Sequence, residues 1–317
     1  MRTAITSYCR RFCLFTLLLL TASCGKKVKF EKTTIINHYA SGSAMAYING
    51  KLYLQGDNMG YLIMLDTDFN AVDSITIIDS VQSPIPKQTK PDIEAATHLQ
   101  DGTGTLLLIS SGSLDPYRNN AWIVNTETKE KTKYDLAPFY GRLKAQGIPD
   151  LNIEGAAGMK DNVILSSRGN KSNLLNHLIF TSAGFWKEPA TAPINIKTLI
   201  TGSSSGSIFS GVSGMAYSEA SDCLLLTVST ENTANSYDDG EIGKSYLWMV
   251  NNISRKTAAA DIVPDRIIDL EAGDTRFHGQ KIETACIISE TQSEMTLALA
   301  ADNDDGKTVL FRITIKK

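Results

Sequence analysis

The sequence predicts an all-β protein, a five-bladed β-propeller with four-stranded antiparallel blades. The main observation is a short pattern in which one polar residue leads a run of small and apolar residues, as in a buried strand. It occurs at 42–47, 92–96, 152–159, 212–217 and 281–286. The lead residues are Ser43, Glu94, Glu154, Ser213 and Glu283, at steps of 51, 60, 59 and 70 residues. Propeller blades repeat every 40–50 residues or so, just below these steps.

The second observation is that each of the first four units offers four strand-like segments joined by turns. In the first unit the turn Asn49-Gly50 favours a tight hairpin. The expected strands are 43–48, 51–55, 61–66 and 71–78 in the first unit and 94–99, 105–110, 121–125 and 132–136 in the second. They are 154–159, 163–167, 177–182 and 194–201 in the third, and 213–218, 223–229, 245–251 and 266–270 in the fourth.

The third observation concerns the ends of the chain. The fifth unit has only three expected strands, 283–289, 295–300 and 308–315, whereas the segment 28–38 is one strand to spare. Because proteins avoid unpaired sheet edges, we expect residues 28–38 to close the ring as the outer strand of the last blade. The alternatives are a β-sandwich, or a six-bladed ring with one blade that the pattern does not reveal. Irregular loops are expected at 79–91, 138–151, 184–193, 202–211 and 231–244.

Residues 1–23 have the character of a secretory signal peptide, and residues 24–317 are expected to form one propeller domain. A basic start with Arg2, Arg10 and Arg11 precedes the apolar run 12–20 and then Thr21-Ala22-Ser23-Cys24. This ending resembles a bacterial lipobox, which implies that Cys24 is lipidated and holds the protein on a membrane. The implied location is the bacterial cell envelope, facing the periplasm or the exterior. The alternative is an ordinary signal peptide in which Cys24 has no role.

Charge and cysteine content exclude several functions. Without residues 1–23 the chain has 28 basic and 34 acidic side chains, a net charge of −6. With no basic block on one face, nucleic acid is not an expected partner. Cys223 and Cys286 both lie in apolar strands, which favours buried free thiols, with a disulfide between neighbouring blades as the alternative. The four scattered His residues give no zinc-binding spacing.

The predicted topology brings polar residues from all five blades to one mouth of the ring. The first strand of a blade begins at the same end of the ring at which its second strand ends. The first-strand residues are Ser43, Glu94, Glu154, Ser213 and Glu283, and the second-strand residues are Asp57, Ser111, Arg168, Glu231 and Asp302. Six of these ten side chains are carboxylates.

Such a mouth predicts a site for a hard cation, with Ca²⁺ as the tentative cofactor, because Ca²⁺ takes six to eight oxygen ligands. Glu94, Glu154 and Glu283 are the first expected ligands, since three adjacent glutamates repel one another unless a cation or protons offset their charge. The further expected ligands are Asp57, Glu231 and Asp302, and the expected ligand-binding residues are Arg168, Ser111, Ser43 and Ser213. The alternative is that the glutamates only end their strands and pair with backbone amides or Arg168.

The inner-strand motifs also resemble those of known families. The segments Asn152-Ile153-Glu154-Gly155, Asp92-Ile93-Glu94-Ala95 and Ser213-Gly214-Met215-Ala216-Tyr217 are similar to those of phytase-like propellers, the group named for an esterase-like activity of phytase. The segment 281–286 is similar to an inner strand of the calcium-activated nucleotidases, which implies five blades and an axial calcium ion. Only Arg168 and Lys281 stand in register for clamping phosphate, fewer basic residues than a phytase would have.

Two functions are therefore expected to compete. The first is a lipid-anchored module of the cell envelope that binds a small molecule or an envelope protein, with an axial calcium ion. The second is a calcium-dependent hydrolase of phosphoric or carboxylic esters, which would use metal-bound water and a glutamate base. The sequence offers no dedicated nucleophile and base pair, which favours the binding module.

Overall fold

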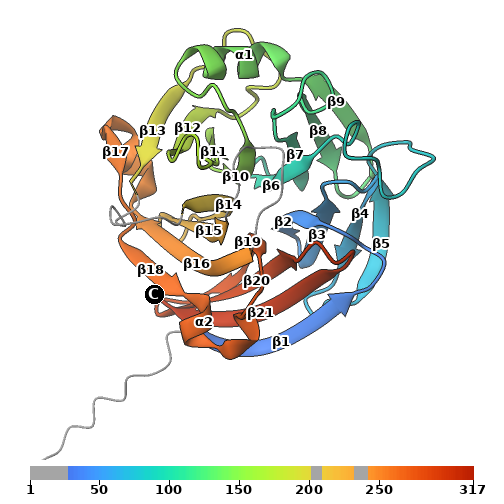
Figure 1. Cartoon of the computed structure of the whole chain (residues 1–317), viewed down its shortest axis with the longest axis vertical. Coiled ribbons are helices and arrows are strands. Elements are labelled where there is room, and N and C mark those ends of the chain that lie inside the picture. Colours follow the sequence, from blue (N-terminus) through green and yellow to red (C-terminus); the bar gives the residue numbers. More distant parts are fainter. Residues whose placement is uncertain (1–27, 201–208, 232–241) are drawn as a thin grey trace, which may run out of the picture.

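The computed structural model describes residues 28–200, 209–231 and 242–317, and this part of the chain forms five antiparallel sheets arranged as the blades of a propeller (Figure 1). The predicted fold class is thereby confirmed. The expected signal peptide, residues 1–23, and Cys24 lie outside the described residues, as do residues 201–208 and 232–241.

Each blade follows the chain outward from its inner strand. The first blade contains β2 (Gly42–Ile48), β3 (Lys51–Gly56), β4 (Tyr61–Leu65) and β5 (Ala71–Thr76). The second contains β6 (Ile93–Leu99), β7 (Thr105–Ser110), β8 (Asn120–Asn125) and β9 (Lys131–Asp135). The third contains β10 (Ile153–Gly158), β11 (Asn162–Ser167), β12 (Asn176–Ser182) and β13 (Asn195–Leu199), and the fourth contains β14 (Ser210–Ser218), β15 (Cys223–Glu231), β16 (Ile242–Asn251) and β18 (Arg266–Asp269).

The fifth blade joins the two ends of the domain. It consists of β19 (Ile282–Glu290), β20 (Glu294–Asp302), β21 (Thr308–Lys316) and, on its outer edge, the N-terminal strand β1 (Val28–Ile36). β1 pairs antiparallel with β21 from Val28 opposite Ile315 to Ile36 opposite Thr308. Figure 1 shows this first strand lying along the last one. The expected ring closure is confirmed, and it leaves β21 paired on both sides.

The core is divided among the five interfaces between neighbouring blades. Apolar side chains alternate along each strand, so every sheet buries one face against the blade before it and the other against the blade after it. Between the first two blades, for example, Tyr53 and Met64 share a buried cluster with Leu106 and Trp122. Cys223 and Cys286 are buried free thiols in two different interfaces.

The inner strands come very close to one another around the axis, which explains their small residues. A Cβ atom added to Gly158 in β10 would lie 2.2 Å from the carbonyl oxygen of His98 in β6. A Cβ atom added to Gly214 in β14 would lie 2.5 Å from the carbonyl oxygen of Glu283 in β19. The axial end of each blade is therefore fixed by direct contact between backbones.

Several short elements were not expected. Within the segment 138–151, expected to be irregular, helix α1 (Ala137–Ala145) connects the second and third blades and buries Phe139, Tyr140 and Leu143. The third blade has a fifth strand, β17 (Asp261–Ile262), which pairs parallel with β13. The remaining short elements are the 3₁₀ turns η1 (Ile253–Ala258) and η2 (Thr275–Phe277) and the helix α2 (Leu270–Gly273).

Candidate functional site

All five lead residues occupy the same special position in the fold. In each blade, the pairing of the first strand with the second shifts register by one residue near the start of the first strand, and the residue passed over is the lead residue. These residues are Ser43, Glu94, Glu154, Ser213 and Glu283. A β-bulge of this kind leaves one residue out of the ladder and redirects its side chain. The bulges thus turn the polar lead side chains away from the hydrophobic interfaces between the blades. The end of the ring where the inner strands begin, and where these side chains lie, is called the polar mouth.

The residue two positions before the lead residue adds a second polar layer in three blades. Asp92, Asn152 and Lys281 each precede an isoleucine and a glutamate. The amide of Asn152 donates to Oε1 of Glu154 at 2.6 Å, and Nζ of Lys281 lies 2.9 Å from Oε1 of Glu283. Two of the three glutamates therefore have a polar partner from the residue two positions earlier in the chain.

Asp92 is the centre of the largest charged cluster at the polar mouth. Its Oδ1 lies 2.8 Å from Nζ of Lys90, and its Oδ2 accepts hydrogen bonds from Nη1 of Arg118 at 2.8 Å and Oγ of Ser111 at 2.5 Å. Asp92 is 4% exposed and has a φ of 54°, a left-handed backbone conformation uncommon for a residue other than glycine. Burial tends to raise its pKa, but the cations of Lys90 and Arg118 outweigh burial and hold the pKa below its usual value.

Lys90 also forms an ion pair with Oδ2 of Asp57, so one ammonium group bridges acids of the first and second blades. Burial raises the pKa of Asp57, and the negative charge of Asp92 raises it further, against the charge of Lys90. Oδ1 of Asp57 is buried and accepts no hydrogen bond of ordinary geometry among the described residues, while the Ser41 side chain is near enough to lower the pKa of Asp57. One oxygen atom from each of Asp57, Asp92 and Glu94 lies within 4.8 Å of the others.

Glu94 is the acid with the least compensation in this group. Burial raises its pKa well above the usual value, and the charges of Asp92, Asp57 and Glu154 raise it further against the charge of Lys90. The interaction with Glu154 extends the acidic cluster from the second blade into the third.

Glu154 continues the cluster towards the fifth blade. Burial raises its pKa to about 8, and Glu283 adds to the rise, whereas the guanidinium of Arg168 opposes it. Arg168 is 6% exposed and its Nη2 lies 3.2 Å from Oγ of Ser229 in the fourth blade. The charges of the three glutamates therefore act on one another around the axis, since Glu154 raises the pKa of Glu94 and Glu283 raises that of Glu154.

Asp302, at the end of β20 in the fifth blade, lies close enough to Glu283 and to Asp57 of the first blade to interact with both acids. Burial raises its pKa to about 7, with further contributions from Asp304, Glu283 and Asp57. Within the described residues Asp302 forms no ion pair with a basic side chain. The amide N–H of Asp304 donates to its Oδ1 at 3.0 Å.

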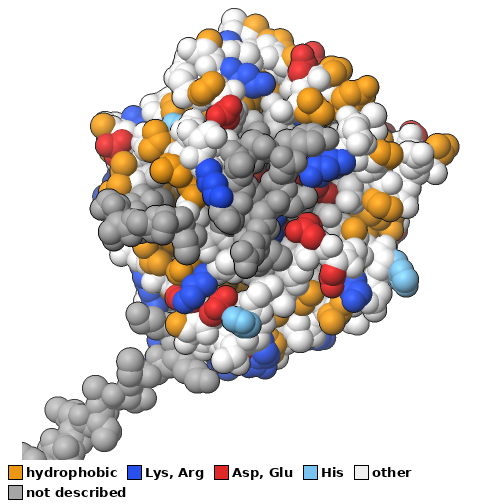
Figure 2. Space-filling model, viewed as in Figure 1, with side chains coloured by type: hydrophobic (Ala, Val, Ile, Leu, Met, Phe, Trp, Pro, Cys, Tyr) orange, Lys and Arg blue, Asp and Glu red, His pale blue; other side chains and the backbone are white. Residues whose placement is uncertain are grey.

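Among the described residues, the polar mouth has more negative than positive charge. Six carboxylates meet four cationic groups: Asp57, Asp92, Glu94, Glu154, Glu283 and Asp302 against Lys90, Arg118, Arg168 and Lys281. Figure 2 shows acidic and basic side chains side by side around the middle of this face. The excess of two negative charges would be offset by one divalent cation or by protons on the acids with raised pKa.

The serines at the polar mouth bond to the protein itself. Oγ of Ser43 donates to the carbonyl oxygen of Ser41 at 2.9 Å, and Oγ of Ser213 donates to that of Ile282 at 2.7 Å. With the bond from Ser111 to Asp92, all three predicted hydroxyl ligands have partners. Glu231 ends β15, and its side chain lies outside the described residues. Ligand binding by these four residues stays a prediction.

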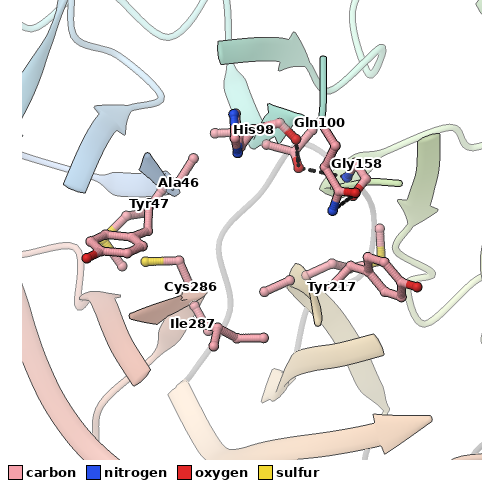
Figure 3. Close-up of a pocket in the computed structure, with 14 residues that line it drawn as sticks. Ala46, Tyr47, His98, Gln100, Gly158, Tyr217, Cys286 and Ile287 are labelled. Carbon is pink, nitrogen blue, oxygen red and sulfur yellow. Dashed lines mark hydrogen bonds between the residues drawn. The ribbon is translucent and has the colours of Figure 1, made fainter. Parts of the chain in front are cut away.

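The opposite mouth is a small cavity of about 110 Å³ where the inner strands end. Its lining includes Ala46, His98, Gly158 and Cys286, and the rings of Tyr47 and Tyr217 point away from its centre (Figure 3). Burial raises the pKa of Cys286 and lowers that of His98, so both groups stay uncharged at neutral pH. The charged chemistry of the axis is concentrated at the polar mouth.

Three functional candidates were missed by sequence reasoning: Lys90, Asp92 and Arg118. Asp92 could have been found, because Asp92 and Asn152 both stand directly before an Ile-Glu pair at the start of an inner strand. Lys90 and Arg118 lie in loops, at positions that no strand periodicity marks.

Residues 38–315 match a protein family described as a family of unknown function, DUF6929. The chain belongs to this family. No curated protein matches it. The DUF6929 match covers all five inner strands and the whole polar mouth.

One solved structure shares the overall fold of this family member. The glutaminyl cyclase of Myxococcus xanthus matches with a TM-score of 0.50 and 9% identity, over 92% of this chain and 97% of that one. A hemopexin-fold protein from cow pea, CP4, matches with a TM-score of 0.39 and 13% identity, over 76% of this chain and 98% of that one. A Bacteroides fragilis protein described as exported matches with a TM-score of 0.40 and 8% identity, over 92% of this chain and 96% of that one. At such identities the first likeness shows the fold alone. Among the described residues there is no helix of the length and apolarity needed to span a membrane.

Proposed function

We propose that this protein is a binding module of the bacterial cell envelope whose polar mouth holds a divalent cation, Ca²⁺ in the first instance, together with a small molecule or an envelope protein. The observation that carries the proposal is the group of carboxylate oxygens from Asp57, Asp92 and Glu94 that lie within 4.8 Å of one another. The rigid ring of blades supplies these acids in a fixed arrangement.

The donor set fits a hard cation. Ca²⁺ prefers carboxylate oxygens at about 2.3–2.6 Å, and oxygens bound to one ion are then separated by distances of the kind seen here. Glu154, Glu283 and Asp302 lie next to the three nearest acids and carry negative charge that also favours a cation. Burial raises the pKa values of Glu94 and Glu154, and repulsion by neighbouring acids adds to the rise; a bound cation would relieve this repulsion, which supports the same interpretation.

Calorimetric titration of the purified protein with CaCl₂, together with melting in Ca²⁺ and in chelator, tests the proposal. We expect saturable binding and a melting temperature that rises by several degrees in Ca²⁺, since a ligand that binds only the folded state stabilises it. Glu94→Gln should weaken binding by about tenfold or more, whereas Glu294→Gln, at an exposed position of β20, should not. A protein that binds neither Ca²⁺ nor Mg²⁺ and melts unchanged would contradict the proposal.

Attachment to a membrane through a lipid on Cys24 is part of the same proposal. It rests on the basic start, the apolar run and the Thr21-Ala22-Ser23-Cys24 ending in the sequence. In cells fed a labelled fatty acid, the protein should carry the label and sediment with membranes. Cys24→Ser should abolish both. Label that remains on the Cys24→Ser protein would show that the lipid is elsewhere.

Ester hydrolysis is the second candidate, and the environment of Glu154 favours it. A carboxyl group with a pKa of about 8 can accept and return a proton near neutral pH, and the nearby cations Arg168 and Lys281 could bind an anionic ester. A bound cation would supply an activated water, whose proton Glu154 would accept. Assays on p-nitrophenyl esters, phytate and nucleoside diphosphates, with Ca²⁺ and with chelator, test this function. Turnover that needs Ca²⁺ and is lost in Glu154→Gln is the expected result, and absence of Ca²⁺-dependent turnover removes the candidate.

A further inference from the structure

The ammonium group of Lys90 stands among the acids that would hold the cation. It pairs with Oδ2 of Asp57 and with Oδ1 of Asp92, and the charge of Glu94 also acts on it. Its side chain is only 13% exposed, so this is a built-in contact and not a surface ion pair. Lys90 lies on the connection that leads into β6. Nη2 of Arg118 donates a hydrogen bond to the carbonyl oxygen of Lys87 on the same connection, at 3.1 Å.

One ligand position beside Lys90 is left over. Oδ1 of Asp57 is buried and accepts no hydrogen bond of ordinary geometry among the described residues, although the Ser41 side chain lies near enough to act on this carboxylate. A buried carboxylate oxygen normally accepts at least one bond. A carboxylate oxygen that lacks such a bond and lies next to two further carboxylates is suited to bind a cation. The Lys90 ammonium bonds Oδ2 of Asp57 and therefore does not supply a partner for Oδ1.

Charge counting points the same way. With Lys90 in place, the acids Asp57, Asp92 and Glu94 together with the cations Lys90 and Arg118 carry a net charge of −1. Without Lys90 they carry −2, which one divalent cation neutralises. A divalent cation added while Lys90 stays would instead leave these five groups with a net charge of +1.

We propose that Lys90 is a tethered competitor of the cation, so that a divalent ion binds to Asp57, Asp92 and Glu94 only as the Lys90 ammonium leaves them. This inference rests on the proposed cation site and adds Lys90 as the residue that sets its affinity. The lysine keeps the acids paired when the ion is absent, and its displacement couples ion binding to a movement of the connection that carries it.

Calcium titrations of the wild type, Lys90→Met and Lys281→Met test the inference. Lys281 is the matched control, because it pairs with Glu283 at the same mouth and is 12% exposed. Removing a charge within about 4 Å of a cation site should change affinity by tenfold or more, and a more distant charge should change it less. We therefore expect Lys90→Met to bind Ca²⁺ at least about tenfold more tightly than the wild type and Lys281→Met less than about threefold more tightly.

The outcomes separate this inference from the proposed function. Equal Ca²⁺ affinity of the wild type and Lys90→Met would show that Lys90 does not compete with the cation, and would leave the proposed cation site unaffected. An equal gain in Ca²⁺ affinity in Lys90→Met and Lys281→Met would lead to the same conclusion. Binding by Lys90→Met but not by the wild type would support the competitor and overturn a cation-dependent function of the natural protein. If neither binds, both proposals are overturned.

A measurement on the wild type guards against a variant that does not fold. Brief acetylation with acetic anhydride, read by mass spectrometry, should modify Lys90 several-fold faster in saturating Ca²⁺ than in chelator, because the displaced ammonium becomes accessible. Labelling of the exposed Lys129 should not change. Equal labelling of Lys90 under both conditions would overturn the inference, and Lys90→Gln provides a second variant for the titration.

Discussion

Asp92 is the residue at the polar mouth on which most other charges depend. Replacing it with asparagine leaves the buried cations of Lys90 and Arg118 without their shared partner. Breaking a buried ion pair from one side typically costs about 3–5 kcal/mol. We expect Asp92→Asn to lower the free energy of unfolding in urea by an amount of this order.

An exposed ion pair provides the control for Asp92. Asp73 pairs with Lys129 at 2.5 Å, with both side chains more than 40% exposed. Solvent screens exposed pairs of this kind, so Asp73→Asn should leave the urea midpoint almost unchanged. Equal effects of the two variants would show that Asp92 is not the centre of a buried network.

Glu154 predicts how stability depends on pH when no cation is bound. Its pKa in the folded protein is about 8, above that of an unfolded glutamate, so the folded state holds a proton that the unfolded state releases. The folded state therefore binds more protons across this interval, and stability falls as pH rises from about 5 to about 8. In chelator, unfolding free energy should fall over this range by on the order of 1–3 kcal/mol.

Glu154→Gln is expected to reduce that pH dependence, because glutamine cannot titrate, while Glu94 and Asp302, whose pKa values are also raised, still can. Saturating Ca²⁺ should reduce it as well in the wild type if the cation site exists. Denaturant unfolding at pH 5, 6, 7 and 8 provides the measurement. A wild type that gains stability towards pH 8 in chelator would contradict the raised pKa.

At the scale of elements, the closeness of the inner strands predicts an unusual sensitivity to a single methyl group. A Cβ atom at Gly158 would meet the backbone carbonyl of His98 at 2.2 Å, and that carbonyl is fixed in β6. We expect Gly158→Ala to cost about 1–3 kcal/mol by overpacking, measured as a loss of unfolding free energy.

Gly141 in helix α1 provides the opposite case. No atom lies within 4 Å of a Cβ atom built there, and alanine favours a helix interior by about 0.5–1 kcal/mol over glycine. Gly141→Ala should therefore stabilise the protein slightly. If both substitutions had the same sign, the close approach of β10 and β6 would not be the cause.

The strands of this fold could be predicted because each inner strand carries its own marker. A polar lead residue before small residues locates the start of β6 or β10, and alternation with Gly-containing turns locates the strands that follow. The bulges at the lead residues could not be predicted, because an added residue in a ladder depends on the partner strand. The five blades and their closure by β1 then follow from counting strands.

The elements that were missed have physical reasons. α1 contains Gly141 and Gly147 follows it, which weakens the local helix signal, and its stability comes from burying Phe139, Tyr140 and Leu143 against two blades. β17 has two residues and exists only because β13 offers an edge. Lys90 was missed because its partners lie in two different blades, which is tertiary information.

At the scale of the whole molecule, function and stability both depend on ring closure. Each carboxylate at the polar mouth is held by one blade, and the acids meet only because the last blade returns to the first. Asp302 of the fifth blade and Asp57 of the first interact across that closing interface. Opening the ring should therefore affect the mouth as well as the blade that loses its strand.

Deleting residues 28–36 is the most direct test of this dependence. The deletion removes β1, exposes the edge of β21 and withdraws Val28 from its buried cluster. We expect the melting temperature to fall by on the order of 10 °C and the protein to self-associate in gel filtration, because a bare strand edge pairs with other chains.

A peptide spanning residues 26–38, added in trans, should reverse both effects by pairing with β21. A peptide of the same composition in scrambled order provides the control, because the alternation that places Val28 and Phe30 against the core is lost. If the shortened protein stays monomeric and has the same melting temperature as the wild type, closure of the ring does not depend on β1. The acids of the fifth and first blades would then be held together by the inner strands β19 and β2 alone.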